Sequence, residues 1–221
     1  MTTSRDDLAR RLALTVITDP RCGEGRRLID VVQAALRGGA PCIQLRAKTE
    51  TAREMVELAR ELREATRAAG ALLVVNDRVD VALAAGADGA HVGDDDLPVP
   101  AARRIVPPGF LLGRSTETPE QAVQARRDGA DYVGVGPVYE TASKDDAGPS
   151  VGLARIAAVT RAAGIPAVGI GGIDATNAAE VARAGAAGVA VIRAVMQAPD
   201  PAEAVRELLR QVHAGLSRRT A

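Results

Sequence analysis

The chain has 221 residues, of which 47% are hydrophobic, and its 28 basic and 28 acidic residues balance. This balance excludes a strong overall field for nucleic acid or anionic membranes, and no stretch reaches the ~20 apolar residues of a membrane span. The N-terminus shows no signal-peptide pattern, and Cys22 and Cys42 fit neither a disulfide framework nor a metal motif, so we expect a cytoplasmic protein.

Two residue types are unusually rare. The aromatic residues are Phe110, Tyr132 and Tyr139 alone, so Ala, Val, Leu and Ile must build the core. The lysines are Lys48 and Lys144 alone, beside 26 arginines. Because the sequence uses arginine wherever a solvated positive charge suffices, the two lysines are candidate functional residues, although chance could also leave two.

The predicted elements alternate along the chain. Met1–Leu12 reads as a polar extension or a short leading helix. Thr51–Ala69 is the clearest later helix, with an apolar side and a charged side, and Pro201–Leu216 is the last. Strands are predicted at Leu14–Thr18, Cys42–Arg46, Leu72–Asn76, Gly89–Val92, Leu111–Arg114, Tyr132–Gly136, Ala167–Gly171 and Gly188–Arg193.

A glycine signature recurs where helices lead into strands, as in "AAGALLV", "RDGADYV" and "AAGIPAV". In each case the glycine is placed to end a helix in the left-handed conformation. Eight strand–helix units in one short chain predict a single domain, residues 1–221, that folds as a (β/α)₈ TIM barrel with short loops. A doubly wound open sheet is the alternative.

Polar residues follow the second, third and fourth predicted strands, where the active site of such a barrel lies. Gln44, Arg46 and Lys48 alternate, so they would point together into the barrel mouth unless that strand is an exposed edge. Asp77 and the run Asp94–Asp96 follow the next two strands, and could instead cap helices. Carboxylates from neighbouring strand ends, without nearby cysteine, suit Mg²⁺ shared with substrate phosphates.

The later strand ends carry different groups. His91 lies within the fourth strand and is interpreted as a core or supporting residue rather than a catalytic one. Thr141, Ser143 and Lys144 follow the sixth strand in a long loop typical of a mobile lid. Gly171-Gly172 follows the seventh strand and suits phosphate binding through backbone N–H groups, although such glycines also permit tight packing.

In this order, from "VITDP" to "DPAEAV", the motifs resemble thiamine phosphate synthases over nearly the whole chain. The resemblance implies a Mg²⁺-dependent transferase that condenses hydroxymethylpyrimidine diphosphate with hydroxyethylthiazole phosphate, or its carboxylated form. The products are thiamine phosphate and diphosphate, formed through a dissociative pyrimidine cation. The implied partners are phosphorylated small molecules, and the oligomeric state stays open, with a homo-oligomer possible.

The resemblance also implies residue roles. Asp77 and Asp96 would bind Mg²⁺, and the catalytic set would be Arg46, Lys48, Ser115 and Lys144. The pyrimidine diphosphate would contact Gln44, Leu45, Arg46, Ala47, Lys48, Asn76, Ser115 and Lys144. The thiazole phosphate would contact Thr141, Ala142, Ser143, Gly172, Ile192 and Arg193.

The chain departs from the family pattern at five positions. Asp94 replaces glutamine, Glu117 replaces histidine, Glu140 replaces proline, Ser143 replaces threonine, and Arg193 replaces serine at a backbone contact. The change at Glu117 leaves the electrostatics near Ser115 open.

Three alternatives remain at this stage. A thiazole tautomerase of the same fold would use a histidine where Glu117 stands and would not need the magnesium acids. A Schiff-base aldolase would need an isolated lysine deep in the barrel. A non-catalytic thiamine phosphate binder would not need Asp77, Asp96 and Lys144.

Overall fold

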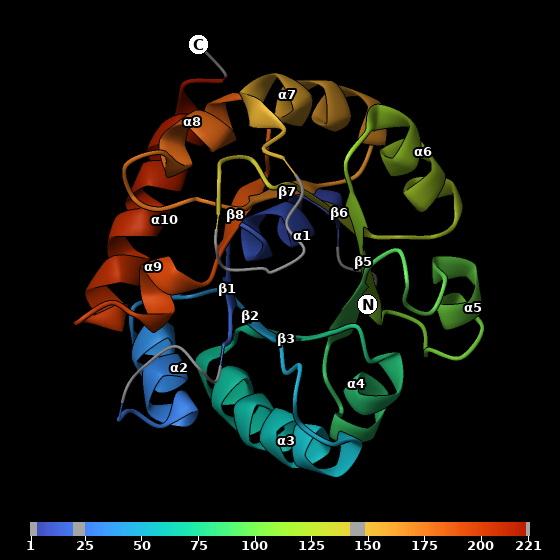
Figure 1. The fold of residues 1–221 in the computed structure, drawn as a ribbon, viewed down its shortest axis with the longest axis vertical. Helices are drawn as coiled ribbons and strands as arrows, with labels where there is room; N and C mark the ends of the chain where they lie inside the picture. The colour runs from blue at the N-terminus through green and yellow to red at the C-terminus, as the bar shows by residue number, and fades with distance from the viewer. Residues whose placement is uncertain (1–3, 20–24, 142–148, 220–221) are drawn as a thin grey trace.

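The eight strands close into a parallel barrel in a computed structural model that describes residues 4–19, 25–141 and 149–219. Each strand pairs with its neighbour in sequence, and β1 pairs with β8. Apart from the first helix, the helices form a ring outside the barrel (Figure 1). The predicted (β/α)₈ barrel is therefore confirmed, and the open sheet is wrong. The strands are β1 (Leu14–Ile17), β2 (Cys42–Leu45), β3 (Leu72–Asn76), β4 (Gly89–Val92), β5 (Leu111–Thr116), β6 (Tyr132–Val135), β7 (Ala167–Ile170) and β8 (Gly188–Val191).

The helices fall where the amphipathic stretches predict them. Thr51 caps α3 in a capping box with Glu54, and Thr118 caps α6 in the same way with Gln121. The glycines that end six of the helix-to-strand units all have positive φ, as the recurring signature predicts. The helices are α1 (Arg5–Arg11), α2 (Leu28–Arg37), α3 (Ala52–Ala69), α4 (Val79–Ala85), α5 (Val99–Arg103), α6 (Pro119–Arg127), α7 (Gly152–Ala163), α8 (Ala178–Arg183), α9 (Arg193–Met196) and α10 (Pro201–Ser217).

The leading helix α1 lies at the amino-terminal end of the barrel. It projects onto the centre of the strand ring in Figure 1, and Arg11 donates a hydrogen bond to the carbonyl of Gly70, just before β3. Leu8 and Leu12 are buried in the core. Because α1 covers this end, the opposite end, where the strands finish, is the one available for a site.

Five predicted strands, β1, β2, β6, β7 and β8, end one or two residues earlier than expected, and two of these ends bear on the site. β2 stops at Leu45, so Arg46 already lies in the loop. β8 stops at Val191, because the chain turns at Ile192, which has φ −111 and ψ −83, and Arg193 begins α9. Within the described residues, none of the helices combines the length and apolar character that crossing a membrane requires.

Candidate functional site

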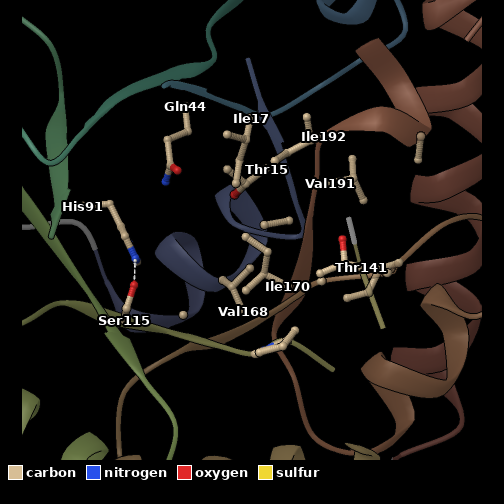
Figure 2. A pocket seen from close by; sticks show the side chains of 18 of the residues that line it. Thr15, Ile17, Gln44, His91, Ser115, Thr141, Val168, Ile170, Val191 and Ile192 are labelled. Carbon is tan, nitrogen blue, oxygen red and sulfur yellow. Dashed lines mark hydrogen bonds between the residues drawn. The ribbon is translucent and has the colours of Figure 1, made fainter. Parts of the chain in front are cut away.

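A pocket of about 550 Å³ opens at the carboxyl ends of the strands. Figure 2 shows that its two sides differ. Gln44, His91 and Ser115 point into it from one side, whereas Val168 and Ile170 form an apolar surface on the other. The pocket therefore offers polar groups and an apolar surface to one ligand set, as a small-molecule site does.

The residues after β2 divide between the pocket and its rim. Gln44 is buried and lines the pocket, whereas the buried Arg46 and the half-exposed Lys48 are not among its lining residues. Thr18 holds the Arg46 backbone, because its hydroxyl accepts from the Arg46 N–H at 3.0 Å and donates to the Arg46 carbonyl at 3.3 Å. The buried Nε of Arg46 has no hydrogen-bond partner among the described residues. A buried guanidinium with an unused donor is suited to an anion.

Asp77 and Asp96 lie together next to Lys48. The Nζ of Lys48 is 3.5 Å from Oδ2 of Asp77, and Oδ2 of Asp96 accepts the Gly93 N–H at 2.7 Å. Burial and then the neighbouring Asp96 raise the pKa of Asp77, although Lys48 opposes the shift. No group of three or more metal-binding side chains occurs in the described part of the chain. The structure therefore offers a two-carboxylate site, of the kind that Mg²⁺ completes with water and phosphate oxygens.

The backbone turns sharply at Asp77, directly after Asn76 at the end of β3. Asp77 has φ 66, which is uncommon for any residue but glycine, and its N–H donates to the His91 carbonyl at 2.8 Å. Asn76 itself lines the pocket. The turn thus separates the two neighbours, with the amide facing the pocket and the carboxylate facing Lys48 and Asp96.

The opposite side of the pocket is built on glycine. Gly171 and Gly172 have φ 97 and 64, and a Cβ on Gly172 would lie 2.6 Å from the Glu140 carbonyl oxygen. Only glycine permits this close approach of two loops. Thr141, Ile192 and Arg193 also line this side. Ala142, Ser143 and Lys144 lie outside the described residues.

Ser115 belongs to a buried polar chain that the sequence did not reveal. Its Oγ is 3.0 Å from Nε2 of His91, and Nδ1 of His91 is 3.2 Å from the Tyr132 hydroxyl. His91 therefore supports Ser115 at the pocket wall. The signal for Tyr132 is its rarity, since it is one of three aromatic residues, but no sequence pattern predicts its contact with His91.

Of the five positions that depart from the family pattern, Asp94, Glu117, Glu140 and Arg193 line the pocket, and Ser143 lies outside the described residues. Asp94 pairs with Arg114, whose buried Nη1 has no hydrogen-bond partner in the described part of the chain. Glu117 and Glu140 are exposed and line the pocket. Asp94, Glu117 and Glu140 therefore place three acidic side chains at the mouth of the pocket. Arg114 neutralises the charge of Asp94.

The fold and the pocket define the class of protein. It is a (β/α)₈ barrel with a mixed polar and apolar pocket at the carboxyl ends of its strands. Residues 14–195 match the family model described as thiamine monophosphate synthase. The chain is 58% identical to the thiamine-phosphate synthase of Roseiflexus castenholzii, across 87% of this chain and 85% of that one. It is 52% identical to that of Moorella thermoacetica, across 88% and 93%.

Among solved structures, thiamine phosphate pyrophosphorylase from Pyrococcus furiosus superposes with a TM-score of 0.87 at 42% identity, covering 95% of this chain and 99% of that one. The chain belongs to the thiamine monophosphate synthase family. It is an enzyme, a transferase of thiamine biosynthesis.

Proposed function

We propose that the enzyme joins hydroxymethylpyrimidine diphosphate to hydroxyethylthiazole phosphate, or to the carboxylated thiazole phosphate, and releases diphosphate. The observation that carries this proposal is the contact of Asp77 with Asp96 and Lys48, together with the buried Arg46, whose Nε has no hydrogen-bond partner among the described residues. Paired carboxylates disfavour each other unless a cation lies between them, and Arg46 and Lys48 favour an anion next to it. A magnesium diphosphate satisfies both requirements.

Asp77 and Asp96 would hold Mg²⁺, and the donor set fits, because both are oxygen ligands in contact with each other. When bound, the ion would neutralise charge on the diphosphate. Arg46, Lys48 and Lys144 would bind the diphosphate oxygens, and Asn76 and Ser115 would donate hydrogen bonds to them. Gln44 would orient the pyrimidine ring inside the pocket.

The reaction needs help for the leaving group more than it needs a base. The bond between the pyrimidine methylene and the diphosphate oxygen breaks first, and the diphosphate keeps the electron pair. The thiazole nitrogen then donates its lone pair to the methylene cation, and with the carboxylated thiazole phosphate the ring also loses CO₂ and gains a proton at that carbon. The cationic groups around the diphosphate favour the first step, because negative charge grows there in the transition state. The apolar surface of Val168 and Ile170 keeps water from the cation.

The thiazole phosphate would bind across the pocket. The N–H groups near Gly172, Ile192 and Arg193 and the side chains of the Thr141–Lys144 loop would contact its phosphate. The Arg193 side chain is exposed, so its contact would use the backbone, and the replacement of serine should matter little.

The test is incubation of the purified protein with both phosphorylated precursors and MgCl₂. Thiamine phosphate and diphosphate should form in equal amounts, and omitting either precursor or chelating the metal should stop both. The Asp77→Asn variant should lose turnover, whereas Asp80→Asn, which removes a surface carboxylate paired with Arg78, should not. Full activity in EDTA, or in Asp77→Asn, would contradict the metal assignment.

The thiazole tautomerase, the second candidate, is disfavoured because Glu117 lines the pocket where that enzyme would place a histidine. The paired acids favour the synthase, because the isomerisation has no diphosphate to neutralise.

A further inference from the structure

Four side chains from four strands form one hydrogen-bonded chain beneath the pocket. Ser115 of β5 contacts His91 of β4, His91 contacts Tyr132 of β6, and Gln44 of β2 hydrogen-bonds to the Tyr132 hydroxyl. Tyr132 is 3% exposed and contributes to the pocket wall. The chain thus links two residues assigned to the pyrimidine diphosphate through two that are not.

The barrel is shaped to hold this pair of rings. A Cβ on Gly113 would lie 2.2 Å from Cζ of Tyr132, and one on Gly134 would lie 3.1 Å from Cε1 of His91. Gly113 pairs in register with both His91 and Tyr132. The ring centroids are 5.5 Å apart. Two inward-facing strand positions therefore lack side chains where the rings require the space.

The bond between Gln44 and Tyr132 favours one direction for the hydrogen bonds along this chain. Burial raises the pKa of Tyr132 well above its ordinary value, so the phenol keeps its proton. The bond from Gln44 lowers that pKa, which is the effect of an amide N–H donating to the phenol oxygen. A phenol that accepts from the Gln44 amide can donate its single hydrogen to Nδ1 of His91, and in that tautomer Nε2 carries the ring proton and donates to Oγ of Ser115.

We propose that His91 and Tyr132 are positioning residues that fix Ser115 as a hydrogen-bond donor toward the departing diphosphate. With its oxygen already accepting from His91, Ser115 turns its own hydrogen into the pocket. If Ser115 instead donated its hydrogen to His91, a lone pair of the Ser115 oxygen would face the anionic diphosphate. This inference rests on the proposed function, since it assigns the diphosphate as the group that Ser115 meets.

A double-mutant cycle tests whether Tyr132 acts through Ser115. The Tyr132→Phe variant keeps the ring and removes only the hydroxyl. We expect Ser115→Ala to lower kcat roughly tenfold or more, and Tyr132→Phe to lower it at least about threefold, with smaller effects on KM. The double variant should be as slow as Ser115→Ala within about twofold, because the effects of coupled residues are not additive. Losses that multiply would overturn the inference.

Two variants of His91 provide the second measurement. The side-chain nitrogen of His91→Gln can occupy the place of Nε2 and still donate to Ser115, whereas His91→Leu cannot. We expect kcat of the His91→Gln variant to be at least about fivefold higher than that of His91→Leu. The reason is that an aligned hydrogen bond from Ser115 to the charged diphosphate is stronger than one to a neutral acceptor. Equal losses would overturn the inference.

The control is Thr66→Val, which removes a buried hydroxyl in α3 that bonds to the Arg63 carbonyl. It should lose stability in thermal unfolding without losing kcat. A wild-type protein that forms no thiamine phosphate would overturn the proposed function and this inference together. A wild-type protein that forms it, with multiplicative losses in the cycle, would overturn this inference alone.

Discussion

Asp77 combines an unusual backbone with an unfavourable charge, and substitution can separate the two. Its φ of 66 is tolerated by Asp and Asn but costs Ala roughly 1–2 kcal/mol. Burial and Asp96 raise the pKa of Asp77, which means that its ionised form is disfavoured in the metal-free fold. Asp77→Asn removes the charge and keeps the backbone tolerance, whereas Asp77→Ala removes the charge and adds strain.

In EDTA we therefore expect Asp77→Asn to unfold at or above the wild-type temperature. Asp77→Ala should be less stable than Asp77→Asn by about 1–2 kcal/mol. For a chain of 221 residues this difference corresponds to roughly 2–8 °C in Tm. Lys48 loses its partner in both variants, but that ion pair is half-exposed on the lysine side and contributes little.

Adding MgCl₂ with inorganic diphosphate should reverse the order of wild type and Asp77→Asn. A ligand present at a hundred times its Kd stabilises the folded state by about 2.7 kcal/mol, and only the wild type keeps both carboxylates. Neither Mg²⁺ nor diphosphate alone should produce the full shift, because each lacks the partner that the site needs. Thermal unfolding followed by circular dichroism measures all of these quantities.

The control Asp80→Asn should respond to the two ligands as the wild type does, since Asp80 pairs with Arg78 away from Asp96. If Asp77→Asn gains as much stability as the wild type from magnesium diphosphate, Asp77 is not a metal ligand. If Asp77→Ala matches Asp77→Asn in EDTA, the backbone argument is wrong.

Three further predictions concern the lysines, the reaction and the buried thiol. Lys48→Arg and Lys144→Arg should fold normally and lose turnover roughly tenfold or more, equivalent to about 1.4 kcal/mol of barrier, because the planar guanidinium of arginine cannot take the place of a compact ammonium. Steady-state kinetics measures the loss. Wild-type rates in both variants would show that the two lysines are ordinary surface charges. Supplied with the thiazole carboxylate tautomer alone, the enzyme should not convert it to the aromatic form, and rapid isomerisation without thiamine phosphate formation from the full substrate set would reassign it as the tautomerase. Burial raises the pKa of Cys42 to about 12, so in a Cys22→Ser background a thiol reagent at neutral pH should label the protein only after urea is added; labelling of the folded protein at the rate of a free thiol would contradict this.

The order of elements could be predicted from the sequence because it depends on local patterns. β3 and β4 begin and end at the predicted residues, and the glycine signature marks the helix ends correctly. The end of β8 could not be predicted, since α9 is four residues long and too short to show a helical period. Ile192 is β-branched and continues the apolar run of the strand, so the sequence pattern extends the strand past Val191.

The part of the site that could be predicted consists of residues at the ends of the strands. Gln44, Asn76 and Ser115 line the pocket, as positions at the ends of parallel strands should. The contact of His91 with Tyr132 depends on the register between strands around the barrel, and on glycines at two facing positions. These are relations between segments far apart in the chain, and no local pattern in a single sequence specifies them.

Glu117 gives the last prediction, because it places a negative charge at the mouth of a pocket proposed to take anions. Its side chain is exposed, so its repulsion acts through water and should be weak and sensitive to salt. The carboxylated thiazole phosphate carries one more negative charge than the decarboxylated form. Glu117→Gln should therefore lower KM for the carboxylated substrate by a factor of about two to five at low ionic strength, and less for the other form.

The matched control is Glu120→Gln, which removes the same charge from the first turn of α6 without lining the pocket. The ratio of the two KM values, measured for each variant at increasing NaCl, separates a local effect from a general one. A local repulsion changes the ratio only in Glu117→Gln and fades as salt rises. If Glu120→Gln changes the ratio equally, the acid at position 117 acts only through net charge. If Glu117→Gln raises KM for the carboxylated form, Glu117 contacts that substrate favourably and the electrostatic reasoning is wrong.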